Sequence, residues 1–492
     1  MNRRLSLYIW LAAVLIGGCT PAAEMPAPDE ESPEPAPTET TTPFPEPSPF
    51  PTRPRYAPGE LVEYTAQPGD TLDALAARFN TSVAEIREAN PVIPLDATTM
   101  PPGMPMQIPI YYLPLWGSPY RILPDWRFVN GPSASRFDTG TFVLQQPGWL
   151  KGQVAFIGGQ NRFGGEIVDQ VAINFSVDPR LLLALLEYQT RALSDPVPPV
   201  NVDSDLLGYR GTSNQGLYLQ LVWAANLLNN GYYSWRIGKL LSFDLIGGAL
   251  ERPDPWQNAA TVSLQHYFSR LHLPDPYHRA IGPDGLAAVY QAYFGDPWES
   301  DEPHIPGSLT QPELFLPFEP RKPWTYTGGP HTGWGKGAPF AGLDFAPPST
   351  TQGCFESSDW VTAPAEGLIV RSQPGIAVLD LDLDGDERTG WAIFFLHIAT
   401  EDRVRVGDHL QRGDPVGHPS CEGGTSTGTH IHIARKYNGE WILAGSGVLP
   451  FNLEGWVAQD GATAYLGLLV RGNQIIRACE CSNLESRVVS GQ

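Results

Sequence analysis

Five residues in the last third of the chain could together form one hydrolytic metal site. They are His331, Asp344, His397, His430 and His432. Around the last two, polar and apolar residues alternate with the period of a half-buried strand, so both imidazoles are expected to project from one face. His331 and Asp344 lie in glycine-rich segments with turn-forming residues. The set therefore combines ligands from at least three separate segments.

The chemistry of this set favours zinc. Zinc accepts imidazole nitrogen and carboxylate oxygen, and three protein ligands leave the fourth position for water, as in catalytic sites. Zinc lowers the pKa of such a water to about 7, which makes a nucleophile available at neutral pH. Histidines that are not ligands could transfer protons or stabilise an oxyanion. The alternatives are a purely structural role for these histidines and a folded but inactive site.

The region from about Trp324 to Trp456 resembles the zinc endopeptidases of the lysostaphin and β-lytic metallopeptidase family, whose usual targets are bacterial cell-wall peptides. The resemblance is carried by Gly-Gly-Pro-His, Gly-Leu-Asp, His-x-His, a hydrophobic strand ending in His397, and a valine- and glycine-punctuated segment before the last motif. It implies that zinc is held by His331, Asp344 and His432. It also implies that His430 acts as general base and that His397 helps to hold the tetrahedral oxyanion.

One departure concerns the first ligand. Many relatives place the first His four residues before the Asp, where this chain has Phe340. The step of thirteen residues from His331 to Asp344 resembles the β-lytic branch instead. If His331 were not the ligand, the site would be incomplete.

An acidic stretch between two apolar segments superficially resembles a calcium loop. Residues 380–387 read Asp-Leu-Asp-Leu-Asp-Gly-Asp-Glu, but the twelfth position, where such a loop needs a bidentate Glu, is Trp391. We expect a polar hairpin turn that joins strands over residues 376–381 and 391–397.

The N-terminus predicts export. Residues 1–19 combine a basic start, an apolar run too short for a comfortable membrane span, and a segment ending in Cys19 that resembles a bacterial lipobox. This predicts a lipoprotein signal peptide with Cys19 lipidated, with a plain secretory signal as the alternative. Residues 20–60, rich in Pro, Glu and Thr, predict a disordered tether with a reach on the order of 100 Å. We therefore expect a membrane-anchored, extracytoplasmic lipoprotein that faces the cell wall, and the net charge of −21 argues against nucleic acid as a partner.

Apart from Cys19, the chain has four cysteines, an even number in a protein predicted to be exported. Three pairings are possible. We favour Cys354 with Cys421, because a metal site must bring their two stretches together. The sequence Cys479-Glu480-Cys481 is expected to be too compact for an easy internal bridge, and a structural zinc on all four thiolates is the alternative.

Residues 61–112 predict a strand-helix-helix-strand order and closely resemble a LysM module. Such modules bind glycans that contain N-acetylglucosamine. The resemblance places the glycan-binding groove at Gly69, Asp70, Thr71 and Asn90. A small packing domain that binds nothing is the alternative.

Residues 118–310 alternate amphipathic helices with Gly and Pro loops and are similar to the lysozyme-like lytic transglycosylases. Gln189 stands where that family has its acid, and an amide cannot protonate a glycosidic oxygen. Glu187 would point elsewhere, about 200° round a helix. We expect a degenerate, all-α spacer or glycan-docking domain, whose aromatics serve either sugar stacking or core packing: Trp223, Tyr232, Tyr233 and Trp235.

These interpretations combine into a multidomain chain that ends in a mainly antiparallel β peptidase domain over residues 321–492. The predicted function is zinc-dependent hydrolysis of peptide bonds in bacterial peptidoglycan, with a lipid anchor and LysM targeting. One alternative is a catalytically inactive peptidoglycan-binding lipoprotein that recruits or activates another wall hydrolase. Another is an endopeptidase for other extracellular proteins.

Overall fold

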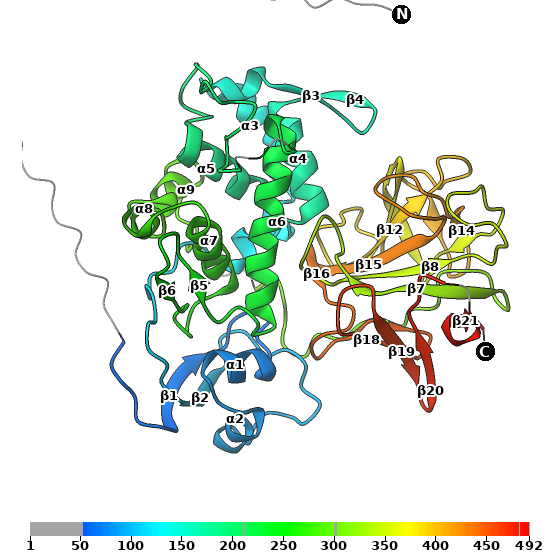
Figure 1. Cartoon of the computed structure of the whole chain (residues 1–492), viewed down its shortest axis with the longest axis horizontal. Coiled ribbons are helices and arrows are strands. Elements are labelled where there is room, and N and C mark those ends of the chain that lie inside the picture. Colours follow the sequence, from blue (N-terminus) through cyan, green and yellow to red (C-terminus); the bar gives the residue numbers. More distant parts are fainter. Residues whose placement is uncertain (1–52, 210, 212, 300–302, 482, 492) are drawn as a thin grey trace, which may run out of the picture. The chain divides into compact units, whose positions relative to one another are not determined.

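The computed structural model describes residues 53–491 except 210, 212, 300–302 and 482 (Figure 1). The predicted signal peptide, Cys19 and most of the tether lie outside the described residues. Residues 50–492 form one compact unit. Among the residues described, none of the helices combines the length and apolar character that a membrane span requires.

The end of the predicted tether is packed, which corrects its predicted boundary at residue 60. Arg53 forms an ion pair with buried Asp254 at 2.6 Å. The ring of Tyr56 contacts those of Trp116 and Trp256. A charged and an aromatic side chain at the end of the proline-rich segment thus contact distant residues of the chain.

The first module has the predicted strand-helix-helix-strand order. Its elements are β1 (Glu60–Thr65), α1 (Leu72–Arg78), α2 (Val83–Ala89) and β2 (Pro105–Ile110), with the two strands antiparallel. Helix α1 begins at Thr71, whose side chain accepts from an N–H of the first turn, and α2 begins with a reciprocal capping box between Ser82 and Glu85. Local sequence signals therefore set both helix starts.

The middle region is built mainly from helices. They are α3 (Thr139–Gln145), α4 (Gly164–Phe175), α5 (Pro179–Thr190), α6 (Gly216–Arg236), α7 (Ala259–Ser269), α8 (Pro274–Ala280) and α9 (Leu286–Phe294). Helix α5 starts at the Asp178 cap and has Pro179 in its first turn. In Figure 1, α6 is the long green helix.

The middle region was predicted to be all-α, but it also contains two short β-hairpins. They are β3 (Val154–Ile157) with β4 (Gln160–Phe163), and β5 (Phe243–Asp244) with β6 (Leu250–Glu251). The first turns on Gly158 and Gly159, both with positive φ, which is the backbone that a tight two-residue hairpin requires. Of the aromatics considered for sugar stacking, three are core residues exposed by 2% or less: Tyr232, Tyr233 and Trp235.

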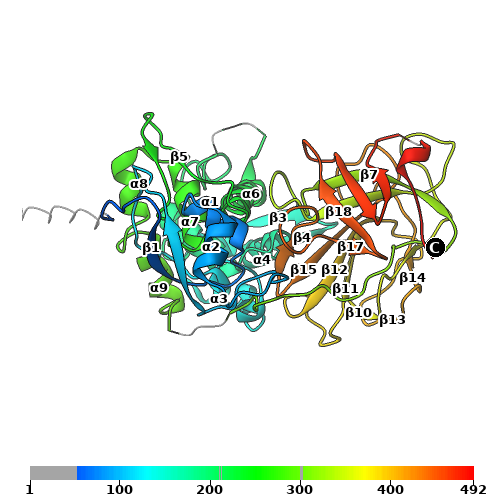
Figure 2. The same cartoon turned by 90° about the horizontal axis from the view of Figure 1, so that it is seen from below.

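The C-terminal region contains a nine-stranded sheet in the order β13-β10-β11-β12-β15-β8-β7-β21, with β16 paired to β15. Its pairings are antiparallel, as predicted. Figure 2 shows β15, β12, β11 and β10 side by side. The strands are β7 (Pro323–His331), β8 (Gly342–Ala346), β10 (Gly367–Gln373), β11 (Gly375–Asp380), β12 (Trp391–Ile398), β13 (His409–Leu410), β15 (Ile431–Tyr437), β16 (Glu440–Ile442) and β21 (Arg487–Val489).

Smaller sheets complete this region. One joins β9 (Val361–Thr362) with β14 (Pro415–Gly417), and another runs β17 (Asn452–Leu453), β18 (Trp456–Asp460), β19 (Gly467–Arg471) and β20 (Gln474–Arg477).

Both faces of the large sheet are buried. On β12, Ile393 and Phe395 enter the core of the C-terminal region, whereas Ala392 and Phe394 belong to the core that contains the helices. This is the side-chain alternation of an extended strand, here apolar on both sides. The predicted polar hairpin is confirmed, because β11 and β12 pair around the acidic stretch.

The disulfides confirm one cysteine prediction and correct another. Cys354 is bonded to Cys421, as predicted. Cys479 is also bonded to Cys481, so the expectation that this pair is too compact was wrong, and the four-thiolate zinc site is ruled out. The chain turns at the single intervening residue, and the two Cα atoms lie 5.0 Å apart, within the usual range for a disulfide.

Candidate metal centre and catalytic histidines

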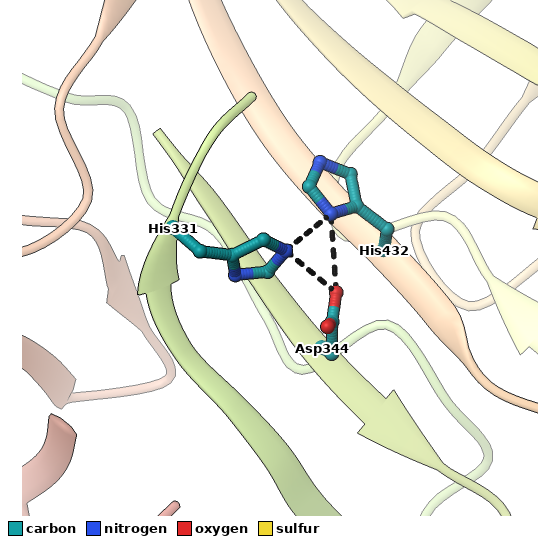
Figure 3. Close-up of side chains that lie close together, drawn as sticks. All are labelled: His331, Asp344 and His432. Atoms are coloured by element: carbon teal, nitrogen blue, oxygen red, sulfur yellow. Dashed lines mark hydrogen bonds and ion pairs between the residues drawn. The ribbon is translucent and has the colours of Figure 1, made fainter. Parts of the chain in front are cut away.

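Three neighbouring strands bring the predicted zinc ligands together. His331 ends β7, Asp344 lies in β8, and His432 lies in β15 directly opposite Asp344. All three side chains are buried. Figure 3 shows them converging from these strands. The proximity follows from strand register, because residues 101 positions apart in sequence become neighbours in one sheet.

The three candidate ligand atoms form a tight triangle. His331 Nε2 lies 3.0 Å from His432 Nδ1 and 3.2 Å from Asp344 Oδ1, and His432 Nδ1 lies 3.1 Å from the same oxygen. Tetrahedral zinc with ligands at 2.0–2.1 Å holds its donors roughly 3.3 Å apart. The triangle therefore needs to open by only a few tenths of an ångström to hold the ion.

Hydrogen bonds on the outer side of both imidazoles fix which nitrogen faces inward. His331 Nδ1 donates to the Gly329 carbonyl at 2.8 Å, and His432 Nε2 donates to the Gly333 carbonyl at 3.1 Å. A neutral imidazole carries one N–H, so each ring turns its lone pair toward the centre. Two lone pairs and a carboxylate that face one another call for a cation, and such outer partners are typical of histidine metal ligands.

Two glycines make room for this packing. A Cβ on Gly342 would lie 2.0 Å from the His432 ring, and one on Gly328 would lie 2.5 Å from the Asp344 carboxylate. The glycine-rich character of the ligand segments is therefore explained by side chains packed directly over the backbone.

The electrostatics of the triangle also suit a cation. Burial alone would raise the pKa of Asp344, but the charge and hydrogen bonds of the adjacent histidines hold it well below its usual range. Burial lowers the pKa of His331, yet the Asp344 carboxylate outweighs this and raises it, whereas burial dominates for His432 and lowers its pKa. A carboxylate held in its ionised form between two imidazoles suits a cation at the centre of the triangle.

The two predicted catalytic histidines lie together beside the ligands. The rings of His397 and His430 are 4.5 Å apart, and His430 Nε2 lies 3.8 Å from Asp344 Oδ2. Each ring donates from Nδ1 to a backbone carbonyl, His397 to Glu422 at 2.8 Å and His430 to Gly428 at 2.7 Å. In the neutral state, each therefore has an unprotonated Nε2.

A local irregularity aims His397 at this site. Opposite β11, the register shifts so that Gly375 pairs with Ile398 and Ile376 pairs with Leu396, which leaves His397 in a bulge with φ of +67°. Such backbone costs of order 1–3 kcal/mol and is concentrated at functional sites. Burial, with His430 nearby, lowers the pKa of His397 to about 4, so this ring is neutral at pH 7.

One further residue belongs to the centre, Tyr465, which is not among the residues predicted from the sequence. Its ring stacks on His331 with centroids 4.2 Å apart, and its carbonyl accepts from the Gly329 N–H at 2.7 Å. Tyr465 thereby packs against the ring of the first ligand. The only signal in the sequence is one aromatic residue among small ones, which is too common to indicate a site.

In the first module, the residues named as glycan-binding have internal partners. Buried Asp70 accepts from the Gln67 N–H and from Arg78, and buried Asn90 exchanges hydrogen bonds with the Gln107 backbone. Thr71 caps α1, and Gly69 lies against the Arg236 guanidinium. These contacts shape the turn, and glycan contact at this turn stays a prediction.

The middle region has no proton donor at the position where a lysozyme-like enzyme would need one. Glu187 accepts from the Leu193 and Ser194 backbone and from Tyr293, so it stabilises the loop after α5. Gln189 contacts the hydroxyl of Tyr267. That the region cleaves no glycosidic bond stays a prediction.

Comparisons with known proteins find similarity to two family models and to bacterial peptidases. Residues 121–307 match the family described as LasA, N-terminal domain, and residues 64–109 match the LysM domain. Protease LasA of Pseudomonas aeruginosa (strain UCBPP-PA14) is 22% identical over 374 residues, which cover 71% of this chain and 79% of that protein. Beta-lytic metalloendopeptidase of Achromobacter lyticus is 27% identical over 136 residues, 26% of this chain and 34% of that protein.

Among solved structures, the M23 metalloprotease pseudoalterin from the deep sea covers 35% of this chain and 96% of its own, with 24% identity and a TM-score of 0.29. The catalytic domain of lysostaphin from Staphylococcus simulans covers 26% and 88%, with 21% identity and a TM-score of 0.18. The matches to Protease LasA, to beta-lytic metalloendopeptidase and to the LysM model confirm the predicted resemblance to this class of peptidase and the LysM module. The middle region matches the LasA N-terminal domain, and its lysozyme-like assignment is not confirmed.

Proposed function

We propose that this chain is a zinc-dependent endopeptidase that hydrolyses peptide bonds of bacterial peptidoglycan. The observation that carries the proposal is the triangle of His331, Asp344 and His432, in which both histidines commit their outer N–H to backbone carbonyls and face one another with lone pairs. The relatives named above are peptidases, which supports the same reaction class.

His331 Nε2, His432 Nδ1 and the Asp344 carboxylate would hold the zinc ion. When bound, zinc supplies Lewis acidity, which polarises a peptide carbonyl and acidifies water. The side chains next to it must then move protons. His430 is the best placed base, because its Nε2 is unprotonated in the neutral ring, faces Asp344 and belongs to a side chain that is 17% exposed.

His397 has a more restricted role in this scheme. Because its Nδ1 already donates to Glu422, it can donate from Nε2 to an oxyanion only as an imidazolium. A pKa of about 4 withholds that proton at neutral pH. We therefore propose that His430 takes a proton from water and that the His397–His430 pair uses this proton to stabilise the oxyanion. His430 later passes the same proton to the leaving amine.

The position of the enzyme in the cell wall is part of the proposal. The LysM module would hold the glycan while the metal centre acts on the peptide, and lipidated Cys19 would tether the chain to a membrane on its extracytoplasmic side. The LysM match supports the first of these statements. The sequence of residues 1–19 is the support for the second.

Zinc content and peptide release from purified peptidoglycan, each with and without chelator, test the function. We expect about one zinc per chain and release that stops when the metal is removed and returns with zinc. Glycan binding without metal or release would instead support the inactive recruiter. Faster cleavage of a soluble protein than of wall material would support an endopeptidase for other extracellular proteins.

A further inference from the structure

The extra residues between the first two ligands dock on a helix of the middle region. We call residues 332–341 the interligand loop. Asn226 and Asn230, one turn apart on α6, each accept a backbone N–H from this loop through Oδ1: from Lys336 at 2.6 Å and from Ala338 at 2.7 Å. Side chains four residues apart lie on the same face of a helix, so the two asparagines form a pair of matched acceptors.

The interligand loop is shaped for this contact. Gly335 and Gly337 both have φ of +85°. A Cβ on Gly335 would lie 2.4 Å from Asn226 Oδ1, and a Cβ on Gly337 would lie 2.2 Å from Asn230 Oδ1. The loop therefore alternates a glycine that permits close approach with a residue that donates its N–H. Trp334 adds an edge contact with Phe175 of α4.

The same loop holds a zinc ligand in its binding tautomer. The Gly333 carbonyl accepts from His432 Nε2, which leaves Nδ1 unprotonated toward the metal position. Gly333 itself is tied to the far end of the loop, because its N–H donates to the Pro339 carbonyl at 2.9 Å. If the residues held by α6 shifted, the Gly333 carbonyl would move with them. This carbonyl sets the tautomer of His432.

We propose that Asn226 and Asn230 are positioning residues for the metal centre and that α6 is part of the outer shell on which zinc affinity depends. This inference rests on the proposed zinc function. It assigns a role to the thirteen-residue step from His331 to Asp344, because its additional residues connect the metal site to α6. Outer partners of histidine ligands typically change metal affinity by 10–100-fold when removed.

The test compares Asn226→Ala/Asn230→Ala with the native full-length chain. Zinc affinity is measured by competition with a chromophoric chelator, and the visible absorption of the cobalt-substituted protein reports ligand geometry. We expect roughly tenfold weaker zinc binding and an altered cobalt spectrum. Asn226→Asp/Asn230→Asp keeps both acceptor oxygens and should restore both readouts.

Arg388→Ala is the matched control, since Arg388 also contacts the middle region, through the Ala134 and Ser135 carbonyls, but not the interligand loop. It should bind zinc as the native chain does. If the double alanine variant fails to fold, Asn226→Ala alone is compared with Asn226→Asp.

Unchanged zinc affinity and cobalt spectrum in folded alanine variants would overturn the inference. Higher peptide release in those variants, with unchanged zinc affinity, would instead mark α6 as an inhibitory cap. A native chain that binds no zinc would refute the proposed function itself, so the two failures are distinguishable.

Discussion

Two groups of side chains in the C-terminal region each place three potential metal ligands close together, and they differ in what their polar atoms already do. In the group of His331, Asp344 and His432, the ligands come from three strands and are buried. In the group of Asp380, Asp382 and Asp384, they come from one hairpin turn, and two of the three are exposed.

The acidic group uses its oxygens to build the turn. Asp380 accepts from the N–H groups of Asp382 and Gly385, and Asp384 accepts from the Asp386 N–H and the Thr389 hydroxyl. In the histidine group, the outer N–H groups are used and the inner lone pairs are left to face one another. Proximity of ligands therefore indicates a metal site only when their hydrogen bonds leave lone pairs directed at a common point.

Removal of a ligand should have the largest effect. His432→Ala is expected to lower zinc affinity by more than roughly 100-fold, the largest loss usual for removal of an outer hydrogen-bond partner. Peptide release should be lost with the metal. Metal content after gel filtration and release from peptidoglycan measure this. Asp384→Ala is the matched control, and loss of zinc from that variant would reverse the comparison between the two groups.

Removal of the base should separate chemistry from metal binding. His430→Ala should retain about one zinc per chain while turnover falls by about 10²–10⁴-fold, the usual contribution of general acid-base catalysis. Zinc analysis and initial rates on the same preparation check it. An equal loss of metal in the His430 and His432 variants would show that the two roles are wrongly divided.

The acidic turn should make the free energy of unfolding depend on pH. Burial and the neighbouring Asp382 raise the pKa of Asp380 from 3.8 to about 7. Because the folded chain keeps this proton over a pH range in which the unfolded chain has lost it, the contribution to the free energy of unfolding declines as pH rises from about 4 to about 7. Thermal unfolding midpoints across this range should show a smaller decline in Asp382→Asn, which removes the adjacent negative charge.

The smallest effect is expected from calcium. A ligand that binds only the folded state raises its stability. Since the carboxylates of Asp380 and Asp384 already accept from N–H groups of the turn, millimolar calcium should leave the unfolding midpoint of the native chain unchanged. A calcium-dependent rise that disappears in Asp382→Asn would show that the turn is a metal site after all.

Predictions from sequence succeeded where chemistry and short-range geometry sufficed. The strand-helix-helix-strand order of the first module, the polar hairpin around residues 380–387 and the alternation around His430 and His432 each rest on short segments, and the structure has the corresponding elements. They failed where partners are distant. The bulge at His397 and the stacking of Tyr465 on His331 depend on strands and loops that the local sequence does not encode.

By itself, the sequence determined which side chains can bind a metal and which segments become strands, because residue type and periodicity are local properties. The tertiary structure decided that β7, β8 and β15 lie side by side, that Gly333 sets the tautomer of His432, and that α6 holds the interligand loop. The physical reason is that the hydrogen-bond partner of a histidine sets its tautomer and the direction of its lone pair. That partner lies on a distant segment, and only the packed chain brings it into place.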